Sequence, residues 1–334
     1  MPSAVEDDHD HDGEAETDDA ASESRDFSVP VGLHGERLDR ALTIAAPEFS
    51  RSYLQQRIAA GDVRNNGAVV SKASAKVRAA DRLQIDLRPT PQSQAFLPED
   101  MPLDIVYQDD DLLVVNKPAG LVVHPAPGNW RGTLLNGLLA RDPAASMLPR
   151  AGIVHRLDKD TSGLMVVARS RRAMDALVKA IAVRDVSRQY LALAHRPWVG
   201  PTEREIDSAI GRDPRNRLRM AVVDLARQSG KTAQTRFILL ENAEEGCWLQ
   251  CVLHTGRTHQ IRVHLASIGH SLVGDATYGG APAAGMQRQA LHAFRLAFDH
   301  PADGRPMAFE APPPADLMQA LSAWGLAYNP PQPA

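Results

Sequence analysis

Strand-like segments dominate residues 102–329 and often follow one another without a helix between them. Apolar or alternating runs recur at residues 104–107, 112–116, 121–124, 164–168, 188–194, 204–210, 218–223, 232–240, 247–254 and 289–298. Helices are expected near residues 133–140 and where Met174, Leu177 and Ile181 recur at helical spacing. Because parallel strands need long crossover connections, this succession predicts an α+β domain with a mixed or antiparallel sheet rather than a doubly wound one.

A smaller α/β unit is expected in front of it, at residues 27–88. Apolar spacing predicts a helix that begins near Leu38 and ends before Pro47, and a second helix capped by Ser50 and ended by Gly61. Short strands are expected at residues 62–64, 68–70 and 82–87, with a turn at residues 65–67. Three prolines among polar residues predict a linker at residues 89–101.

The charge of the chain is unevenly distributed. Residues 1–26 carry eleven carboxylates against one arginine, a net charge of −10, whereas the whole chain carries −4. The remaining 308 residues therefore carry +6, which permits binding to nucleic acid. The acidic segment has no aromatic residues before Phe27 and is expected to be disordered; solvation is its usual role, and competition with RNA for a basic surface is the alternative.

Localisation follows from what the sequence lacks. There is no long apolar run that could span a membrane, and the N-terminus has no secretory signal, so we expect a cytoplasmic protein with no membrane partner. Cys247 and Cys251 lie in one strand-like run, about 13 Å apart along an extended chain. That separation is too large for a disulfide, so both are expected to be small buried core residues.

One loop combines many charged groups directly before a buried strand. Residues 155–160 contain His155, Arg156, Asp158, Lys159 and Asp160, and residues 161–163 are small turn formers. An apolar run follows at residues 164–168. A charged loop mounted on a buried strand is typical of functional sites, although the same residue types also form ordinary turns.

A second candidate segment covers residues 188–193. Strand alternation places Leu191 and Leu193 on one face and Arg188 and Tyr190 on the other. If the leucines face the core, Tyr190 faces a surface or cleft, where it could stack on a base and offer a hydroxyl. A half-buried tyrosine without a functional role is the alternative interpretation.

The third candidate segment covers residues 254–265. Thr258 is the expected N-cap of a helix that ends at Gly269, with Ile261 on its inward stripe. His259 and Arg262 flank that stripe, where an arginine can reach a buried carboxylate and keep it ionised. The N-terminus of the helix would itself favour a phosphate.

Metal and cofactor chemistry is not expected. Histidines 254, 259 and 264 recur every five residues and do not share one helical face, and Lys159 separates Asp158 from Asp160. Nucleotide-binding glycine motifs, the HExxH motif and the G-x-S-x-G motif are all absent from the sequence.

Residues 27–88 resemble the S4 RNA-binding domain. The similarity lies in residues 37–42, in residues 50–52 with Ile58 and Gly61, and in residues 63–67, where Asn65 replaces the apolar residue common in the family. The resemblance implies that basic side chains of this unit bind RNA, among them Arg51, Arg57 and Lys72.

Residues 102–329 resemble the RluA family of RNA pseudouridine synthases. The similarity lies in four ordered segments, namely residues 114–125, 152–164, 255–264 and 274–279. With an S4-like unit in front, the chain is most similar to the subgroup that modifies large-subunit (23S) ribosomal RNA. The resemblance implies isomerisation of uridine to pseudouridine, without metal or cofactor, in the stem-loop of helix 69.

The resemblance also implies a role for each candidate side chain. Asp158 would be the catalytic carboxylate, which either attacks C1′ or assists removal of the C2′ proton. Arg262 would pair with Asp158, and Tyr190 would stack on the uracil and accept the C5 proton. Arg156 would fill the gap left by the flipped base, and the RNA contacts would also include His155, Arg257 and His259. Asp160 is expected to shape the turn.

Two alternatives stay open at this stage. A synthase of the same family could act on another rRNA or tRNA site with the same residues, and a non-catalytic RNA-binding ribosome-assembly factor could share the basic front unit. A pure RNA binder has no evident use for a carboxylate amid the cations of the 155–160 loop, because a carboxylate repels phosphate. The expected partner is large-subunit rRNA or a pre-ribosomal particle, bound by a monomer.

Overall fold

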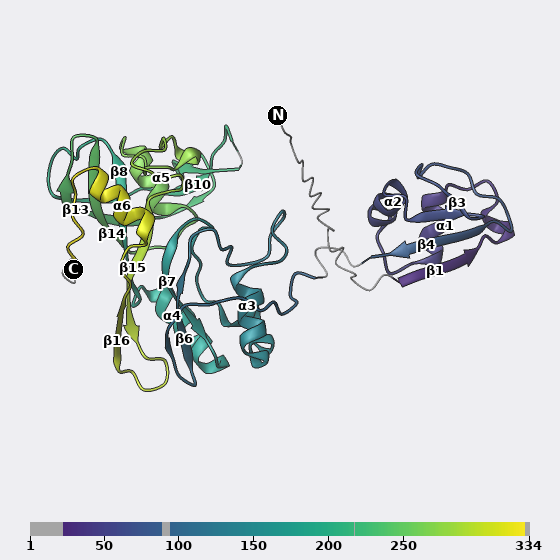
Figure 1. The fold of residues 1–334 in the computed structure, drawn as a ribbon, viewed down its shortest axis with the longest axis horizontal. Helices are drawn as coiled ribbons and strands as arrows, with labels where there is room; N and C mark the ends of the chain where they lie inside the picture. The colour runs from purple at the N-terminus through teal and green to yellow at the C-terminus, as the bar shows by residue number, and fades with distance from the viewer. Residues whose placement is uncertain (1–22, 89–93, 217, 331–334) are drawn as a thin grey trace, which may run out of the picture. The chain divides into compact units, whose positions relative to one another are not determined.

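The computed structural model describes residues 23–88, 94–216 and 218–330, which divide into two compact units at Gln94/Ala95 (Figure 1). The acidic residues 1–22 and the linker residues 89–93 lie outside the described residues, so the interpretations that concern them stay predictions.

The small unit is a four-stranded antiparallel sheet with two helices packed on it (Figure 1). The strand order is β1-β4-β2-β3. Its elements are β1 (Glu23–Ser28), a 3-10 turn η1 (Val31–Leu33), α1 (Leu38–Ala45), α2 (Arg51–Ala59), β2 (Val63–Asn65), β3 (Ala68–Val69) and β4 (Arg82–Leu87). Both expected helices and all three expected strands are present.

Local sequence explains these elements. Ser50 caps α2 by accepting a hydrogen bond from the Tyr53 N–H, and Leu54 and Ile58 of that helix are fully buried. Asn66 and Gly67 both have positive φ, as a tight hairpin turn between β2 and β3 requires.

The acidic tail was expected to extend to residue 26, but a strand, β1, already begins at Glu23. Residues 23–28 form β1, which pairs with β4 from Glu23↔Leu87 to Ser28↔Arg82. Only Arg25 and Phe27 of the inward-facing positions are half-buried, so the sequence shows little of the apolar alternation that marks a strand. The strand forms because it covers the otherwise unpaired edge of β4.

The large unit is built on a nine-stranded mixed sheet, as the sequence predicts. The strand order is β5-β6-β7-β15-β8-β14-β13-β9, with β16 paired to β15, and β7 and β15 run parallel while the other pairs in this sheet are antiparallel. The strands are β5 (Ile105–Gln108), β6 (Leu112–Lys117), β7 (Ser162–Ala168), β8 (Ser187–His195), β9 (Glu203–Asp207), β13 (Gln234–Asn242), β14 (Gly246–Leu253), β15 (Leu291–Asp299) and β16 (Pro306–Glu310).

Helices cover both faces of this sheet. One face packs against α3 (Leu134–Arg141) and α5 (Gln260–Ser267), and the opposite face packs against α4 (Arg171–Val183) and α6 (Ala315–Ala323). Short 3-10 segments η2 (Pro143–Met147), η3 (Pro149–Gly152) and η4 (Ala276–Tyr278) complete the unit. Leu191 and Leu193 face α6 whereas Tyr190 faces the α5 side, so the alternation expected for this strand is confirmed.

The expected strand at residues 204–210 is in fact two strands of different sheets. Residues 203–207 form β9 at the edge of the large sheet, and the chain then enters a three-stranded sheet of β10 (Ile210–Arg212), β11 (Met220–Val222) and β12 (Gly230–Lys231). The expected strand at residues 121–124 is also wrong. It makes only an isolated bridge, Val122↔Thr133, because its carbonyl groups accept hydrogen bonds from Lys117 Nζ and from the N–H groups at the start of α3.

Residues 95–101, expected in the linker, pack onto α3 instead. The Asn136 side chain donates hydrogen bonds to the carbonyls of Ala95 and Leu97, and Glu99 accepts from the Gly132 N–H. Buried amide partners of this kind hold a Pro-flanked polar segment in place, which composition alone does not show.

Two simpler expectations concern residues outside the site. Cys247 and Cys251 are both buried and unbridged, as expected. Within the described residues, no helix has the length and apolar character needed to cross a membrane.

Gly163, at the start of β7, gives a test of this packing. A Cβ at this position would lie 2.2 Å from the Ala293 carbonyl oxygen of β15, and φ is +116°. We expect Gly163→Ala to lower the free energy of unfolding by more than ~2 kcal/mol, measured by denaturant titration. Gly128→Ala is the matched control, because φ is +85° there but nothing lies within 4 Å of an added Cβ. Equal losses in the two variants would contradict the steric explanation.

Candidate active site

The 155–160 loop is held in place by main-chain contacts on both sides. The Thr161 N–H donates to the Asp158 carbonyl at 3.2 Å and closes the turn that leads into β7. Ile153, just before the loop, bridges to Val167 of β7. The loop is therefore fixed at both ends to the same buried strand.

The side chains of Lys117 and Arg288 hold two carbonyl groups at the end of the loop. Lys117, 1% exposed, donates from Nζ to the carbonyls of Pro118, Leu121 and Lys159 at 2.7–2.9 Å. Burial lowers the pKa of Lys117 to about 7, against the opposing charges of Asp160 and Asp158. Arg288 donates to the Asp160 carbonyl at 2.9 Å and is itself held by an ion pair with Asp316 of α6.

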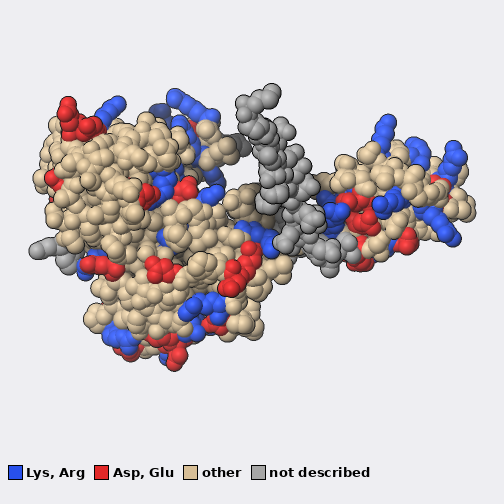
Figure 2. All heavy atoms as spheres, viewed as in Figure 1, with Lys and Arg blue, Asp and Glu red and all other residues tan. Residues whose placement is uncertain are grey.

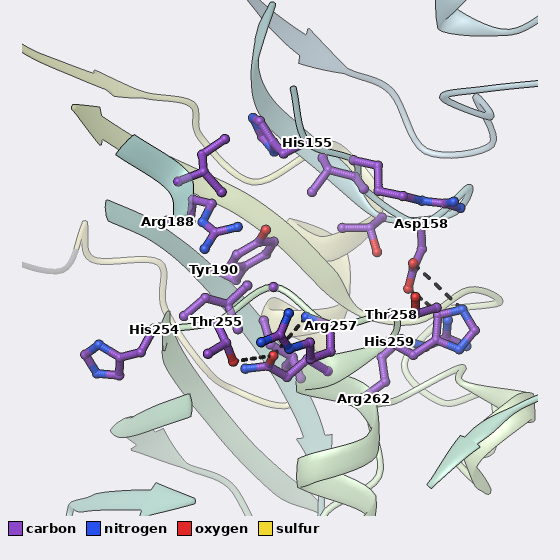
Figure 3. Close-up of a pocket in the computed structure, with 18 of the residues that line it drawn as sticks. His155, Asp158, Arg188, Tyr190, His254, Thr255, Arg257, Thr258, His259 and Arg262 are labelled. Carbon is purple, nitrogen blue, oxygen red and sulfur yellow. Dashed lines mark hydrogen bonds and ion pairs between the residues drawn. The ribbon is translucent and has the colours of Figure 1, made fainter. Parts of the chain in front are cut away.

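A cleft of about 380 Å³ lies beside this loop. It is lined by the loop itself, by the first half of β8, by the end of α4 and by residues 253–262 at the start of α5. Figure 3 shows Asp158, Tyr190 and Arg262 around the same space, from three segments far apart in the sequence. The three residues that the sequence singled out as catalytic candidates are thus brought together.

Arg262 of α5 joins two carboxylates. Its Nη1 donates to Asp158 Oδ2 at 2.9 Å, and its Nε and Nη2 donate to the two oxygens of Asp275 at 2.7 and 2.8 Å. Burial alone would lower the pKa of Arg262, but the hydrogen bond and charge of Asp275, followed by those of Asp158, raise it above its usual value. The guanidinium is therefore a permanent cation held against Asp158.

Tyr278 supports this arrangement from below. Its ring packs against the Arg262 guanidinium at 5.0 Å, and its hydroxyl lies 2.8 Å from His259 Nδ1 and accepts the Met220 N–H of β11 at 3.0 Å. His259 Nε2 lies 3.8 Å from Asp158 Oδ1, and burial lowers the pKa of His259 although Asp158 opposes the shift. His259 therefore faces the catalytic candidate as a mainly neutral ring.

Tyr190 lines the cleft with 6% of its surface exposed. Burial raises the pKa of its hydroxyl to about 12, against the opposing charge of Arg188. The side chain is thus an apolar face with a protonated phenol at neutral pH. Such a face can stack on a planar ring that enters the cleft.

The remaining candidates in this unit differ in accessibility. Arg156 is exposed at the cleft and Arg257 is half-buried, donating from Nε to the Thr232 carbonyl at 3.0 Å. The His155 Nε2 accepts the Val166 N–H at 3.1 Å, and burial lowers the pKa of His155 to about 3. His155 therefore offers no positive charge to a phosphate, and its visible contact is with β7.

The expected N-cap of α5, Thr258, is wrong. The helix begins at Gln260, and its N-cap is His259 in the left-handed conformation with φ 57°. The Gln260 side chain explains the difference, because it accepts from Thr255 Oγ1 and the Arg257 N–H and donates to Thr235 Oγ1. These bonds fold residues 255–259 back over the helix start and delay its first turn.

Sequence reasoning assigned no role to Asp275, Tyr278 or Lys117. Both segments, residues 274–279 and 114–125, contribute to the family resemblance. The sequence feature that could have identified Asp275 and Lys117 is a charged side chain next to glycine or proline in each segment. Within residues 23–88, 94–216 and 218–330, no group of three or more His, Cys, Asp or Glu side chains is arranged to hold a metal ion.

In the small unit, buried carboxylates organise several arginines. Asp39, fully buried, accepts from Nε and Nη2 of both Arg37 and Arg51, and the hydrogen bond from Arg37 is the largest cause of the lowered pKa of this carboxyl. Arg57 pairs with Asp62 and packs on Tyr53, whereas Lys72 is exposed. Figure 2 shows Lys and Arg side chains projecting from the visible face of this unit.

Asp275 gives a stability test of the site. Asp275→Asn removes the charge that pairs with buried Arg262, and we expect a loss of about 3 kcal/mol in the free energy of unfolding. Asp175→Asn is the control, because Asp175 pairs with Arg171 on the exposed face of α4 and should contribute less than ~0.5 kcal/mol. Thermal and denaturant unfolding of both variants measures the difference; an Asp275 variant no less stable than the control would contradict the buried network.

Comparison with known proteins shows which family this chain belongs to. Residues 111–267 match the model of the RNA pseudouridylate synthase family. A ribosomal large subunit pseudouridine synthase D of Neisseria meningitidis is 48% identical over 89% of this chain and 80% of its own length, and one of Xylella fastidiosa is 47% identical over 92% and 94%. The solved structure of human RNA pseudouridylate synthase domain containing 1 is 30% identical, covers 67% of this chain and 88% of its own, and has a TM-score of 0.53. With these relatives the chain belongs to the RNA pseudouridylate synthase family, and this protein is an RNA pseudouridine synthase.

Proposed function

We propose that this enzyme converts specific uridines of large-subunit (23S) ribosomal RNA to pseudouridine, with Asp158 as the catalytic carboxylate. The observation that carries the proposal is the meeting of Asp158, Arg262 and Tyr190 in one cleft. Asp158 is 19% exposed, so it is open to the cleft on the side that Arg262 does not cover. A substrate ribose could therefore reach it.

The reaction needs a group that acts at the ribose and a surface that holds the detached base. Pseudouridine formation breaks the N1–C1′ bond, turns the uracil and joins it through C5. Asp158 can attack C1′ or assist removal of the C2′ proton, and both routes use the same carboxylate. Arg262 steadies the charge and direction of Asp158 in either route.

Tyr190 would hold the uracil and take part in the final proton removal. Because its hydroxyl is protonated at neutral pH, it can accept the C5 proton only if it passes its own proton to another base. Among the described residues that line the cleft, Asp158 is the one carboxylate, so it is the proposed acceptor. Stacking on the tyrosine ring would keep the free uracil from leaving while it turns.

A uridine inside a helix must leave its stack before it can enter the cleft. Arg156 is exposed at the cleft and belongs to the same rigid loop as Asp158, which supports the proposal that it fills the gap left by the flipped base. Arg257 and His259 lie across the cleft and would contact the RNA from the α5 side.

The choice of RNA rests on the relatives and on the front unit. Relatives at 44–48% identity carry the name of large-subunit synthase D, and the resemblance points to the stem-loop of helix 69. We propose that residues 27–88 are an S4-like domain that binds this RNA. Asp39 uses only Nε and Nη2 of Arg37 and Arg51, which leaves the Nη1 groups available for phosphates, and Lys72 is exposed beside no described partner.

The cellular setting follows from the substrate. We propose a cytoplasmic monomer that meets its target as ribosomal RNA or within a pre-ribosomal particle. Pseudouridine mapping of cells with and without the protein identifies the modified positions and distinguishes helix 69 from another rRNA or a tRNA target.

Asp158→Asn tests the catalytic assignment. The variant keeps the size of the side chain but loses the charge that acts at the ribose, so we expect pseudouridine formation in a helix 69 fragment to fall at least ~1000-fold. RNA binding, measured as Kd, should stay within a few-fold because a neutral amide does not repel phosphate. Asp160→Asn is the matched control, since Asp160 contacts Arg288 through its carbonyl and does not line the cleft. Full activity of Asp158→Asn would contradict the assignment of Asp158 as the catalytic carboxylate.

A further inference from the structure

Arg188 is a buried cation that has no hydrogen-bond or ion-pair partner among the described residues. It lies on β8, two residues before Tyr190, with 7% of its surface exposed. Its Nε is buried without an acceptor, and within the part of the chain that the structure describes no hydrogen bond or ion pair involves its guanidinium. Leaving a charge buried and unpaired costs several kcal/mol in a folded protein.

The surroundings of Arg188 contain no spare counter-charge. Asp158 is the one carboxylate among the described residues that line the cleft, and it is engaged by Arg262. The other charged side chains of the lining are Arg156, Arg184 and Arg257, which are also cationic. The unpaired arginine therefore belongs to a cleft that is strongly positive apart from its catalytic group.

The position of the guanidinium is built into the fold. Strand alternation places Arg188 and Tyr190 on the same face of β8, about 7 Å apart. Figure 3 shows the two side chains next to one another, with the guanidinium directed into the cleft. Gly256 gives it room, because a Cβ at residue 256 would lie 2.7 Å from Arg188 Nη1.

We propose that Arg188 forms a subsite for a backbone phosphate of the RNA, next to the uridine that is flipped into the cleft. The inference rests on the proposed placement of that uridine between Tyr190 and Asp158. A phosphate is the anion that RNA brings into such a cleft, whereas the uracil itself is neutral. A guanidinium fork matches the oxygens of a phosphate and can donate two bonds to it.

This subsite would give the unpaired arginine a purpose. In the free enzyme the buried charge lacks a partner, and in the complex it gains one at the moment the nucleotide enters. Binding energy from the phosphate would then be used to hold the flipped nucleotide, with the base on Tyr190 and the sugar at Asp158. An arginine kept for this task should weaken the fold rather than stabilise it.

A substitution cycle tests the contact directly. Wild-type enzyme and Arg188→Gln are each combined with helix 69 fragments in which one phosphate near the target uridine is either kept (charged RNA) or replaced by an uncharged methylphosphonate (neutral RNA). Both RNAs carry 2′-O-methyl on the ribose that precedes this position. Kd is measured by filter binding for each combination. We expect Arg188→Gln to weaken binding of the charged RNA about 10- to 100-fold. A methylphosphonate at one position should weaken binding by the wild-type enzyme as much as Arg188→Gln does. The same methylphosphonate should weaken binding by the Arg188→Gln variant less than about threefold.

Three controls separate this from a structural role. Arg204→Gln removes an exposed arginine from β9 at the far edge of the sheet and should leave Kd within about twofold. Arg188→Gln should not lower the Tm, and it should reduce the slope of log K against log salt by about 1. Arg188→Lys keeps the charge and should recover part of the affinity.

The outcomes distinguish the subsite from the enzyme's target. The fold-change in Kd from Arg188→Gln is compared with that from each methylphosphonate within one nucleotide of the target. If, at every position, the two changes together give the product of their separate fold-changes, the phosphate subsite is wrong, even if wild-type enzyme converts the charged RNA. If Arg188→Gln and one methylphosphonate together raise Kd by clearly less than the product of their separate effects, the subsite stands. If wild-type enzyme then forms no pseudouridine in the fragment, the proposed target is wrong. A marked fall in Tm with multiplying effects would assign Arg188 to the fold instead.

Discussion

The Arg262 guanidinium, held between Asp275 and Asp158, is the interaction on which the rest of the site depends. Asp275 takes two of the donor groups with nearly ideal geometry and is itself 1% exposed, so the arginine cannot turn away from the cleft. The third donor group is then aimed at Asp158. Because Asp158 sits on a loop, its direction is set by the Arg262 guanidinium of α5, which is itself held by the buried carboxylate of Asp275.

The surrounding fold serves this geometry. Lys117 and Arg288 hold the carbonyls of Lys159 and Asp160 at the end of the loop, and Tyr278 links the Arg262 guanidinium to the main chain of β11. The three-stranded sheet and the C-terminal helix α6 therefore both reach the site, although neither lines it. A loop fixed through its backbone in this way leaves its side chains free to meet a substrate.

Sequence periodicity could predict what depends on neighbouring residues. Strand alternation predicted that Tyr190 lies on the opposite face of β8 from Leu191, and helical spacing predicted that Arg262 lies beside the inward stripe of α5. Both predictions agree with the structure. The Asp158–Arg262 contact joins residues 104 positions apart, so it came from the family resemblance and not from spacing. Asp275 and Lys117 were missed for the same reason, since a role that consists of long-range partners has no local pattern. β1 was missed because it is short of apolar residues and only Arg25 and Phe27 of its side chains are half-buried. Thr258 was wrongly expected as the N-cap because the Gln260 side chain competes with the helix start.

The two buried arginines of the cleft show how charge is divided in an enzyme that binds a polyanion. Arg262 is paired with two protein carboxylates and keeps its orientation without RNA, whereas Arg188 has no partner in the part of the chain that the structure describes. In the proposed mechanism, Arg262 orients the Asp158 carboxylate before substrate arrives, and Arg188 is left to bind the substrate. The positive lining that results favours RNA over a free nucleoside, because a nucleoside brings no phosphate to neutralise it.

The most direct test is the structure of this enzyme bound to a helix 69 fragment that carries 5-fluorouridine at the target, because fluorine replaces the C5 proton and blocks the last step. The account predicts a flipped base stacked on Tyr190, its ribose C1′ next to the Asp158 carboxylate, and Arg262 still bonded to Asp158 and Asp275. A target nucleotide seated elsewhere, or an Asp158 turned away from the ribose with Arg262 released, would contradict it.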